Sequence, residues 1–188
     1  MAATPEQIYQ KTLVLRAQLG DEQAFNELFS LYGPRLLQFA RKLLQSAPDR
    51  VEDLTQEIWL AIYRQLPRLN ELDKFKPWAF RIARDKIYGE YRRRHWAIEP
   101  LDESQAVPDS VTTTADLPVE ELYLSLDRIP TLQREALVLH FLEAMSYEEI
   151  SRIMGSSVGT VRSRIFYGKR ALKQAMETRS YEPEPKNT

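Results

Sequence analysis

The chain has 188 residues, 43% of them hydrophobic, which is enough to build one ordinary domain or two small ones with real cores. Its 26 basic and 27 acidic residues leave a net charge of −1, so binding to nucleic acid would require positive charge to be segregated onto particular surfaces. The absence of cysteine excludes disulfides and thiolate metal sites, and two histidines alone do not favour a zinc centre.

Two further features narrow the class of protein. The glycine count of 6 and the long stretches with helical periodicity favour an all-α fold. The N-terminus lacks a basic segment followed by an apolar core, and no apolar run approaches ~18 residues. We therefore expect a cytoplasmic protein without membrane insertion.

Two helices are predicted before residue 45. Apolar residues at helical spacing predict a short helix that ends at Gly20, and Asp21 is a candidate N-cap for a longer helix that continues to about Leu44. The dipeptide Gly33-Pro34 lies inside the longer helix, and a proline in a helix interior is expected to kink or split it.

The third predicted helix, from Asp49 to Leu66, has an acidic outward face. Asp53 and Glu57 are four residues apart and so share one face, with Gln56 beside them. No histidine or third carboxylate stands at a spacing that would complete a metal or acid-base site on this helix. A solvated face and a docking surface for a basic partner are both compatible with this pattern.

A fourth helix is predicted from Trp78 to Arg94, after a break at Pro67. It combines aromatic side chains with six basic residues and two acidic ones. Bases stack on aromatic rings and the phosphate backbone requires cations, so the combination favours a grip on single-stranded nucleic acid. The alternative is that Trp78, Phe80 and Ile82 are simply core residues.

The composition changes between Trp96 and Pro118, where there is no lysine or arginine but there are five acidic residues and three prolines. This composition predicts a flexible acidic linker. It divides the chain into two small helical domains at 1–95 and 119–176, with the linker at 96–118 and a disordered tail at 177–188.

The second domain is predicted to begin with a helix at 119–129, which Pro130 ends. Thr131 is a candidate cap for a helix that continues to Leu142. The expected exposed residues of this helix are Arg134, Glu135 and Glu143, and the expected inward residues are Leu132, Ala136, Leu139 and Phe141.

The stretch from Ser146 to Lys173 predicts a helix-turn-helix. Ser146 and Glu149 have the spacing of a capping box, which satisfies two amide donors at a helix start. Gly155 supplies the left-handed position that ends this helix, and Ser157 can cap the next one. A short turn between two such helices is typical of a DNA-binding motif.

The second helix of this motif separates an apolar stripe from a basic face. The stripe consists of Val158, Val161, Ile165, Gly168 and Leu172, and the outward side of Gly159, Arg162, Ser163, Phe166 and Arg170. Five basic residues and no acidic one lie between positions 162 and 173, on an element narrow enough for a major groove. A solvated amphipathic helix in a bundle is the alternative interpretation.

Three motifs together resemble one family, the extracytoplasmic function (ECF) group of bacterial sigma factors. The resemblance covers about residues 21–173. The motifs are Asp53-Leu54-Thr55-Gln56-Glu57, the run from Phe75 through Trp78 to Ala83, and Ser146–Ile150 followed by Val158–Ile165.

The resemblance implies a role in transcription initiation. Asp53, Gln56 and Glu57 would dock on the clamp helices of the largest subunit of core RNA polymerase. The first domain would open the minus-ten element of promoter DNA and hold its displaced strand with Phe75, Trp78, Arg81, Arg84, Lys86, Tyr88, Arg92 and Arg93. The second domain would read the minus-thirty-five element with Tyr147, Gly159, Thr160, Arg162, Ser163, Arg164, Phe166 and Arg170.

The same resemblance implies a protein that is not an enzyme, needs no cofactor or metal, is monomeric when free of partners and is held silent by an anti-sigma factor. The sequence departs from the family pattern at three places. Asp85 replaces a usual asparagine, Gly89-Glu90 replaces a usual aspartate followed by an aromatic or basic residue, and Tyr167-Gly168 replaces a usual basic-alanine pair. Carboxylates that face DNA are repulsive, so the first two departures bear on minus-ten preference.

Two other functions remain open from the residues alone. An autonomous helix-turn-helix regulator needs only residues 146–173 and would not use Asp53 or Glu57. A helical interaction protein without a DNA role would tolerate the loss of Arg162. An enzyme is least favoured, because no phosphate-cradling glycine loop, nucleophile elbow or ligand cluster is present.

Overall fold

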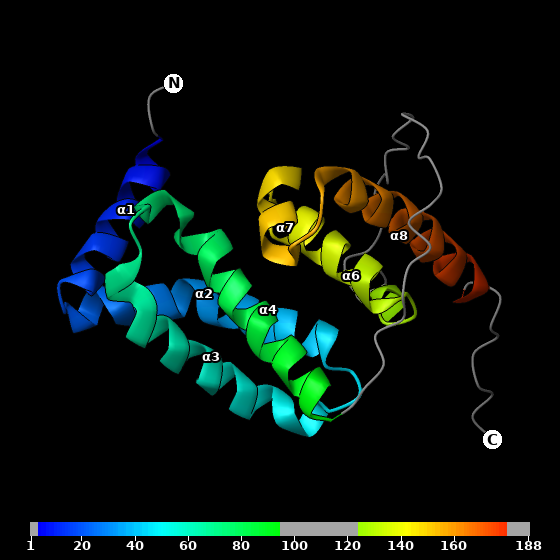
Figure 1. Ribbon diagram of the computed structural model, residues 1–188, viewed down its shortest axis with the longest axis horizontal. Coiled ribbons are helices and arrows are strands. Elements are labelled where there is room, and N and C mark those ends of the chain that lie inside the picture. The colour runs from blue at the N-terminus through cyan, green and yellow to red at the C-terminus, as the bar shows by residue number, and fades with distance from the viewer. Residues whose placement is uncertain (1–3, 95–123, 180–188) are drawn as a thin grey trace, which may run out of the picture. The chain divides into compact units, whose positions relative to one another are not determined.

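The computed structural model describes residues 4–94 and 124–179, and within these ranges every regular element is helical (Figure 1). The chain divides into two compact units, Met1–Trp96 and Ala97–Thr188. The predicted all-α class with two helical domains is therefore confirmed. The predicted linker at 96–118 lies outside the described residues, as does the tail beyond residue 179.

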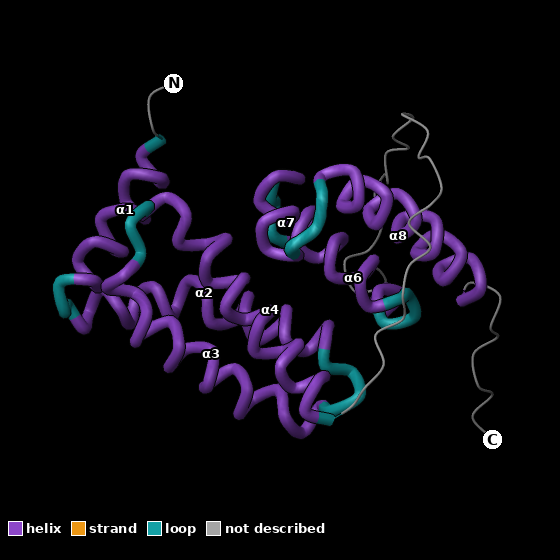
Figure 2. The backbone as a smooth tube through the Cα atoms, viewed as in Figure 1, coloured by secondary structure: helices purple, strands orange, loops and turns teal. Residues whose placement is uncertain are grey.

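The first unit is built from four helices joined by short turns (Figure 2). The helices are α1 (Pro5–Gln18), α2 (Glu22–Leu43), α3 (Val51–Gln65) and α4 (Phe75–Arg93), and the 3-10 turns are η1 (Pro48–Arg50), η2 (Leu66–Arg68) and η3 (Leu72–Lys74). Helix α2 contacts the other three helices, and α3 also packs on α4. The fully buried side chains of this core include Leu28, Leu36, Phe39, Leu54, Ile58, Ile62, Phe80 and Ile87.

The start of α2 follows the prediction. The Asp21 carboxylate accepts hydrogen bonds from the backbone N–H groups of Gln23 and Ala24, at 3.0 and 3.1 Å, and so caps the helix. The Arg16 guanidinium also pairs with it at 2.7 Å. The amide of Ala24, followed by the hydrogen bond from Arg16, holds the pKa of Asp21 below its ordinary value.

The expected split at Gly33-Pro34 does not occur, because α2 runs without interruption from Glu22 to Leu43 with Pro34 inside it. Proline cannot donate to the carbonyl four residues earlier, which belongs to Ser30. Both Ser30 and Pro34 are exposed, so water can satisfy that carbonyl. Burial of residues on both sides of the proline, such as Leu28 and Leu36, keeps the two halves on one core.

The second unit contains α6 (Thr131–Leu137), a π-helical turn η4 (Val138–Leu142), α7 (Tyr147–Met154) and α8 (Val158–Arg179). Residues 124–126 are also helical. Helix α8 packs along α6 and against α7, and the residues between them form a small apolar core. Its most buried members are Ala136, Leu139, Ile150 and Val161.

Several expectations for α6 were wrong. Its N-cap is Pro130, and Thr131 is the first helical residue, whose hydroxyl accepts a hydrogen bond from Arg134 at 3.2 Å. Arg134, Glu135 and Glu143, expected to be exposed, are buried. The prediction assumed one solvent face, but residues 133–139 are all buried, so this stretch presents no such face.

Phe141 was expected to face inward, yet its side chain is 47% exposed. The π-helical turn at Val138–Leu142 explains the difference. A π turn rotates less per residue than an α turn, so residues inside it, including Phe141, depart from the faces that a regular helical pattern assigns to them. The regular pattern therefore placed Phe141 on the wrong side.

Candidate protein and nucleic-acid interfaces

The acidic face of α3 is exposed. The side chains of Asp53 and Glu57 are 65% and 43% exposed, and Gln56 is exposed between them. Arg50, the last residue of η1, reaches both carboxylates, with distances of 2.8 Å to Asp53 and 3.2 Å to Glu57. The face therefore presents carboxylates that are accessible but already share a cation.

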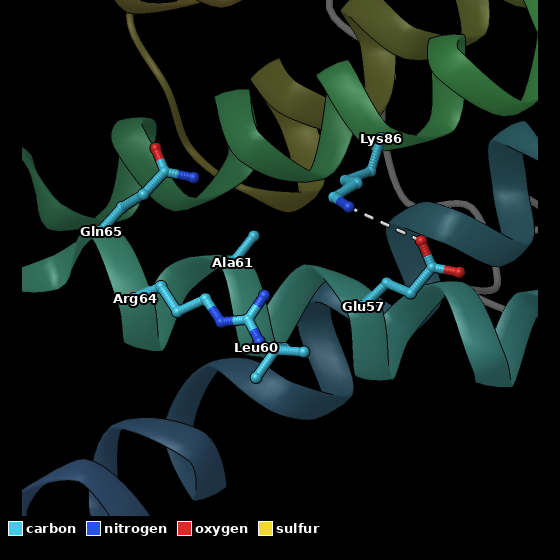
Figure 3. A pocket seen from close by; sticks show the side chains of 6 residues that line it. All are labelled: Glu57, Leu60, Ala61, Arg64, Gln65 and Lys86. Carbon is cyan, nitrogen blue, oxygen red and sulfur yellow. Dashed lines mark ion pairs between the residues drawn. The ribbon is translucent and has the colours of Figure 1, made fainter.

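A shallow hollow lies beside this face, between α3 and α4 (Figure 3). Its lining consists of Glu57, Leu60, Ala61, Arg64, Gln65 and Lys86. Lys86 comes from α4, and its ammonium lies 3.6 Å from the Glu57 carboxylate, as the dashed line in Figure 3 marks. Within the described residues no group of three or more His, Cys, Asp or Glu side chains is placed to hold a metal ion.

The aromatic residues of α4 divide between core and surface. Phe80 and Ile82 are buried, as the core interpretation expects. Phe75 and Tyr88, which were predicted to hold DNA, are buried as well. Trp78 is half-buried and packs against Phe75 with ring centroids 5.9 Å apart. Among the aromatic residues predicted to hold DNA, Trp78 is therefore the more accessible, while Phe75 and Tyr88 support the helix from beneath.

The basic residues of α4 are arranged on its outer side. Arg81, Arg92 and Arg93 are exposed, whereas Lys86 is half-buried. Arg84 is half-buried too, with its guanidinium carbon 4.1 Å from the centre of the Tyr88 ring, within the range of a cation–π interaction. The predicted minus-ten residues thus share one helix, with cations outside and buried rings beneath.

Glu90 was not recognised as a structural residue from the sequence. Its side chain is 1% exposed and forms ion pairs with Arg93, with Arg94 at 2.8 Å and with Arg50 at 3.5 Å. Arg50 was also missed, although its positions three and seven residues before Asp53 and Glu57 place it on their face of the helix. That spacing could have identified it.

The helix-turn-helix forms as predicted. The Ser146 hydroxyl accepts a hydrogen bond from the Glu149 amide at 3.2 Å, and the Glu149 carboxylate accepts one from the Ser146 amide at 2.9 Å. Gly155 ends α7 with φ of 62°, a left-handed conformation that favours glycine. The Ser157 hydroxyl accepts a hydrogen bond from the Thr160 amide at 3.0 Å, and so caps α8.

Helix α8 turns its apolar stripe inward and its cations outward. Val161, Ile165 and Leu172 are buried as expected. The predicted DNA-reading residues fall into three groups: exposed Gly159, Arg162 and Arg170; half-buried Tyr147, Thr160, Ser163 and Phe166; and buried Arg164. Arg164 donates a hydrogen bond to the Ser156 hydroxyl at 3.3 Å, which ties α8 to the turn before it.

The two units match two family models, Sigma-70 region 2 over residues 28–97 and Sigma-70, region 4 over residues 119–172. The ECF RNA polymerase sigma-E factor of Escherichia coli (strain K12) is 31% identical over 186 residues, which cover 92% of this chain and 96% of that protein. The ECF RNA polymerase sigma factor EcfG of Rhodopseudomonas palustris (strain TIE-1) is 36% identical over 134 residues, covering 70% and 74%.

Solved structures agree with these matches. The sigma factor RpoE of Bartonella quintana, in complex with the anti-sigma factor NepR, has a TM-score of 0.64 at 25% identity and covers 81% of this chain and 96% of its own. CnrH, in complex with the cytosolic domain of CnrY, has the same fold, with a TM-score of 0.64 at 24% identity, covering 90% and 97%.

These matches define the class of protein as a transcription initiation factor of the sigma-70 type. The chain belongs to the ECF sigma factors, which confirms the resemblance found in its motifs. It is an alternative sigma factor, which directs promoter recognition together with RNA polymerase. Among the described residues, no helix combines the length and apolarity needed to cross a bilayer.

Proposed function

We propose that the two units divide the recognition of a promoter between them, and that α3 attaches the first unit to core RNA polymerase. The observation that carries this proposal is the separation of charge. Exposed carboxylates gather on α3, whereas exposed arginines gather on α4 and α8. The carboxylates of α3 suit a basic protein surface, and the arginines of α4 and α8 suit the phosphates of DNA.

The minus-thirty-five element is read by α8 in the major groove. Arg162 lies one turn into the helix and is exposed, so its guanidinium can form a bidentate contact with a guanine edge. Phe166 follows on the same side and suits a thymine methyl group. Arg164 was predicted to read the same element. Its burial and its hydrogen bond to Ser156 suit it to fix the turn before α8 rather than to contact a base.

The minus-ten element is opened and held by α4. Trp78 offers a partly accessible ring for stacking, and Arg81 and Arg92 offer exposed cations for the phosphates of the displaced strand. Phe75 and Tyr88, both buried, act by supporting this surface. The arrangement suits an unpaired strand, because it combines a ring with cations along one helix.

An anti-sigma factor is the regulator that this proposal includes. The similar RpoE of Bartonella quintana was solved in complex with the anti-sigma factor NepR. A partner of this kind would silence the present chain by covering the polymerase-docking residues on α3 or the arginines on α4 and α8. The proposed site of action is the cytoplasm, because core polymerase and promoter DNA are both found there.

The polymerase-docking step is tested by charge reversal. Asp53→Lys combined with Glu57→Lys should abolish copurification of the chain with core RNA polymerase. Glu52→Lys is the matched control. Glu52 is an exposed carboxylate that immediately precedes Asp53, and it therefore lies about 100° away from Asp53 around α3. Unchanged copurification of the double variant would exclude docking through this face.

The DNA-reading step is tested by Arg162→Ala, which should weaken binding of holoenzyme to its promoter by about 1–3 kcal/mol if the contact is to a base edge. Lys173→Ala is the control, since Lys173 is 79% exposed near the other end of α8. Equal and small losses for the two variants would favour a solvated basic helix over direct recognition of bases.

A further inference from the structure

A line of ion pairs crosses from α3 to α4 and joins the two proposed surfaces of the first unit. Lys86 of α4 pairs with Glu57 of α3 at 3.6 Å (Figure 3). Farther along the same antiparallel pair of helices, Glu90 of α4 pairs with Arg50 at 3.5 Å. Arg50 itself binds Glu57 at 3.2 Å and Asp53 at 2.8 Å, which closes the line.

The α4 end of this line is a buried carboxylate. The Glu90 side chain is 1% exposed, and its charge is offset by Arg50, Arg93 and Arg94. A carboxylate withdrawn from water in this way is stable only if cations remain beside it. The buried Glu90 carboxylate therefore requires guanidinium groups beside it. When one of the three arginines is lost, the ion pairs of Glu90 with the remaining arginines become stronger.

The arginines that Glu90 holds can leave without a change in the backbone. Arg93 and Arg94 lie at the end of α4, and their side chains are 61% and 36% exposed. Arg93 belongs to the proposed minus-ten surface, as does Lys86 at the other ion pair. Both cations are thus engaged by carboxylates in the free chain, which lowers their availability to phosphates.

Resting on the proposed function, we propose that Glu90 is a positioning residue that, through Arg50, couples the docking of core RNA polymerase on α3 to the grip of α4 on the promoter strand. A basic surface that docks on Asp53 and Glu57 competes with Arg50 and Lys86 for these carboxylates. Lys86 is then released toward the DNA. Arg50 loses two of its three partners and turns to Glu90.

The consequence for α4 follows from charge balance. Once Arg50 neutralises Glu90 fully, Arg93 and Arg94 are bound less strongly and become available to phosphates. By thermodynamic reciprocity, DNA that engages these arginines returns Arg50 to Glu90 and frees Asp53 and Glu57 for the polymerase. Free chain grips DNA weakly, and docked chain grips it well, without any rearrangement of the helices.

The test compares Glu90→Gln with wild type in the free full-length chain and in holoenzyme, using a fluorescently labelled oligo(dT) over a range of salt concentrations. In the free chain, two released arginines steepen the slope of log affinity against log salt by about 1.4. Between about 50 and 200 mM salt, the affinity of the variant should therefore fall about sevenfold more than the affinity of wild type. In holoenzyme the slopes of variant and wild type should coincide, because docking has already released the arginines.

Asp85→Asn is the matched control, because Asp85 is an exposed carboxylate on the same helix. Removal of its charge should change affinity for oligo(dT) by the same factor in free chain and in holoenzyme. Far-UV circular dichroism checks that each variant folds. Core polymerase alone gives the background of DNA binding that does not involve the chain.

A second variant keeps the proposal falsifiable if Glu90→Gln fails to fold. Arg50→Gln leaves Glu90 with Arg93 and Arg94, so docking should release Lys86 alone, and the salt slope should steepen from free variant to holoenzyme by about 0.7 instead of the about 2.1 expected for wild type. Identical slopes for Glu90→Gln and wild type in the free chain, or a steepening in Arg50→Gln as large as that of wild type, would overturn the proposal. Failure of wild type to form holoenzyme at all would instead refute docking through α3.

Discussion

Gly168 allows α8 to lie close to α6, and replacing it by alanine should destabilise the second unit. A Cβ atom at this position would lie 3.1 Å from Cγ and Cδ1 of Leu137 and 3.3 Å from Cβ of Gln133. Both neighbours are buried, so neither side chain has open space into which it can move. The two helices would have to separate slightly to admit the added methyl group.

The magnitude is a difference between two terms. Alanine in the middle of a helix is favoured over glycine by about 0.5–1 kcal/mol, since glycine loses more backbone entropy on folding. Overpacking a closely packed site costs about 1–3 kcal/mol. The net effect of Gly168→Ala is therefore a loss of about 1 kcal/mol, which lowers the melting temperature of a unit of this size by roughly 4–8 °C.

Gly89→Ala on α4 is the matched control, because a Cβ there would meet just one atom, Nη2 of Arg92, at 3.9 Å. It should stabilise the first unit by about 0.5–1 kcal/mol. All three tryptophans lie between residues 1 and 96, so tryptophan fluorescence follows the first unit, whereas circular dichroism follows both. Gly168→Ala should lower the melting temperature of the second unit, seen by circular dichroism, and leave the fluorescence-detected unfolding of the first unit unchanged. Stabilisation by Gly168→Ala, or destabilisation by Gly89→Ala, would refute the packing argument.

Three further predictions concern single contacts. The lowered pKa of Asp21 means that its ionised form stabilises α2 above the ordinary pKa of 3.8 and that this contribution is lost as pH falls through the lowered value. The difference in unfolding free energy between wild type and Asp21→Asn should therefore persist at neutral pH and disappear in acid. Ser146→Ala removes the capping box and should cost about 1 kcal/mol in urea denaturation, whereas Glu149→Gln retains the box and most of the stability. Tyr91→Phe deprives the buried Leu43 carbonyl of a 2.6 Å hydrogen bond and should lower the fluorescence-detected stability by about 1 kcal/mol.

Signals confined to a few neighbouring residues were sufficient to predict helix ends. Ser146, Glu149 and Gly155 set the boundaries of α7, and Asp21 begins α2, because each acts on amides or carbonyls within one turn of itself. The outward position of Arg162 was predictable for the same reason, since the periodicity of a regular helix fixes which side its residues face.

Features that depend on contacts between helices were not predictable. All residues from 133 to 139 are buried, Glu135 among them, which requires packing on more than one side of α6 and cannot be derived from a one-face pattern. Exposure of Phe141 accompanies a π turn that no local residue pattern signals. Pro34 predicted a break that the packing of α2 against three other helices prevents. At Pro34, tertiary contacts thus outweigh a local preference worth about 3 kcal/mol.

The two acidic departures from the family pattern on α4 have different consequences for DNA binding. The sequence suggested that Asp85 and Glu90 would both repel the promoter strand. Glu90, however, is buried and offset by three arginines, so its field at the surface is largely cancelled and its effect on DNA passes through Arg93 and Arg94. Asp85 is exposed on the same helix as Arg81 and Arg92, and its charge reaches the solvent directly. Any altered minus-ten preference of this sigma factor should therefore depend on Asp85, whereas Glu90 should affect how strongly, and in which state, the strand is held.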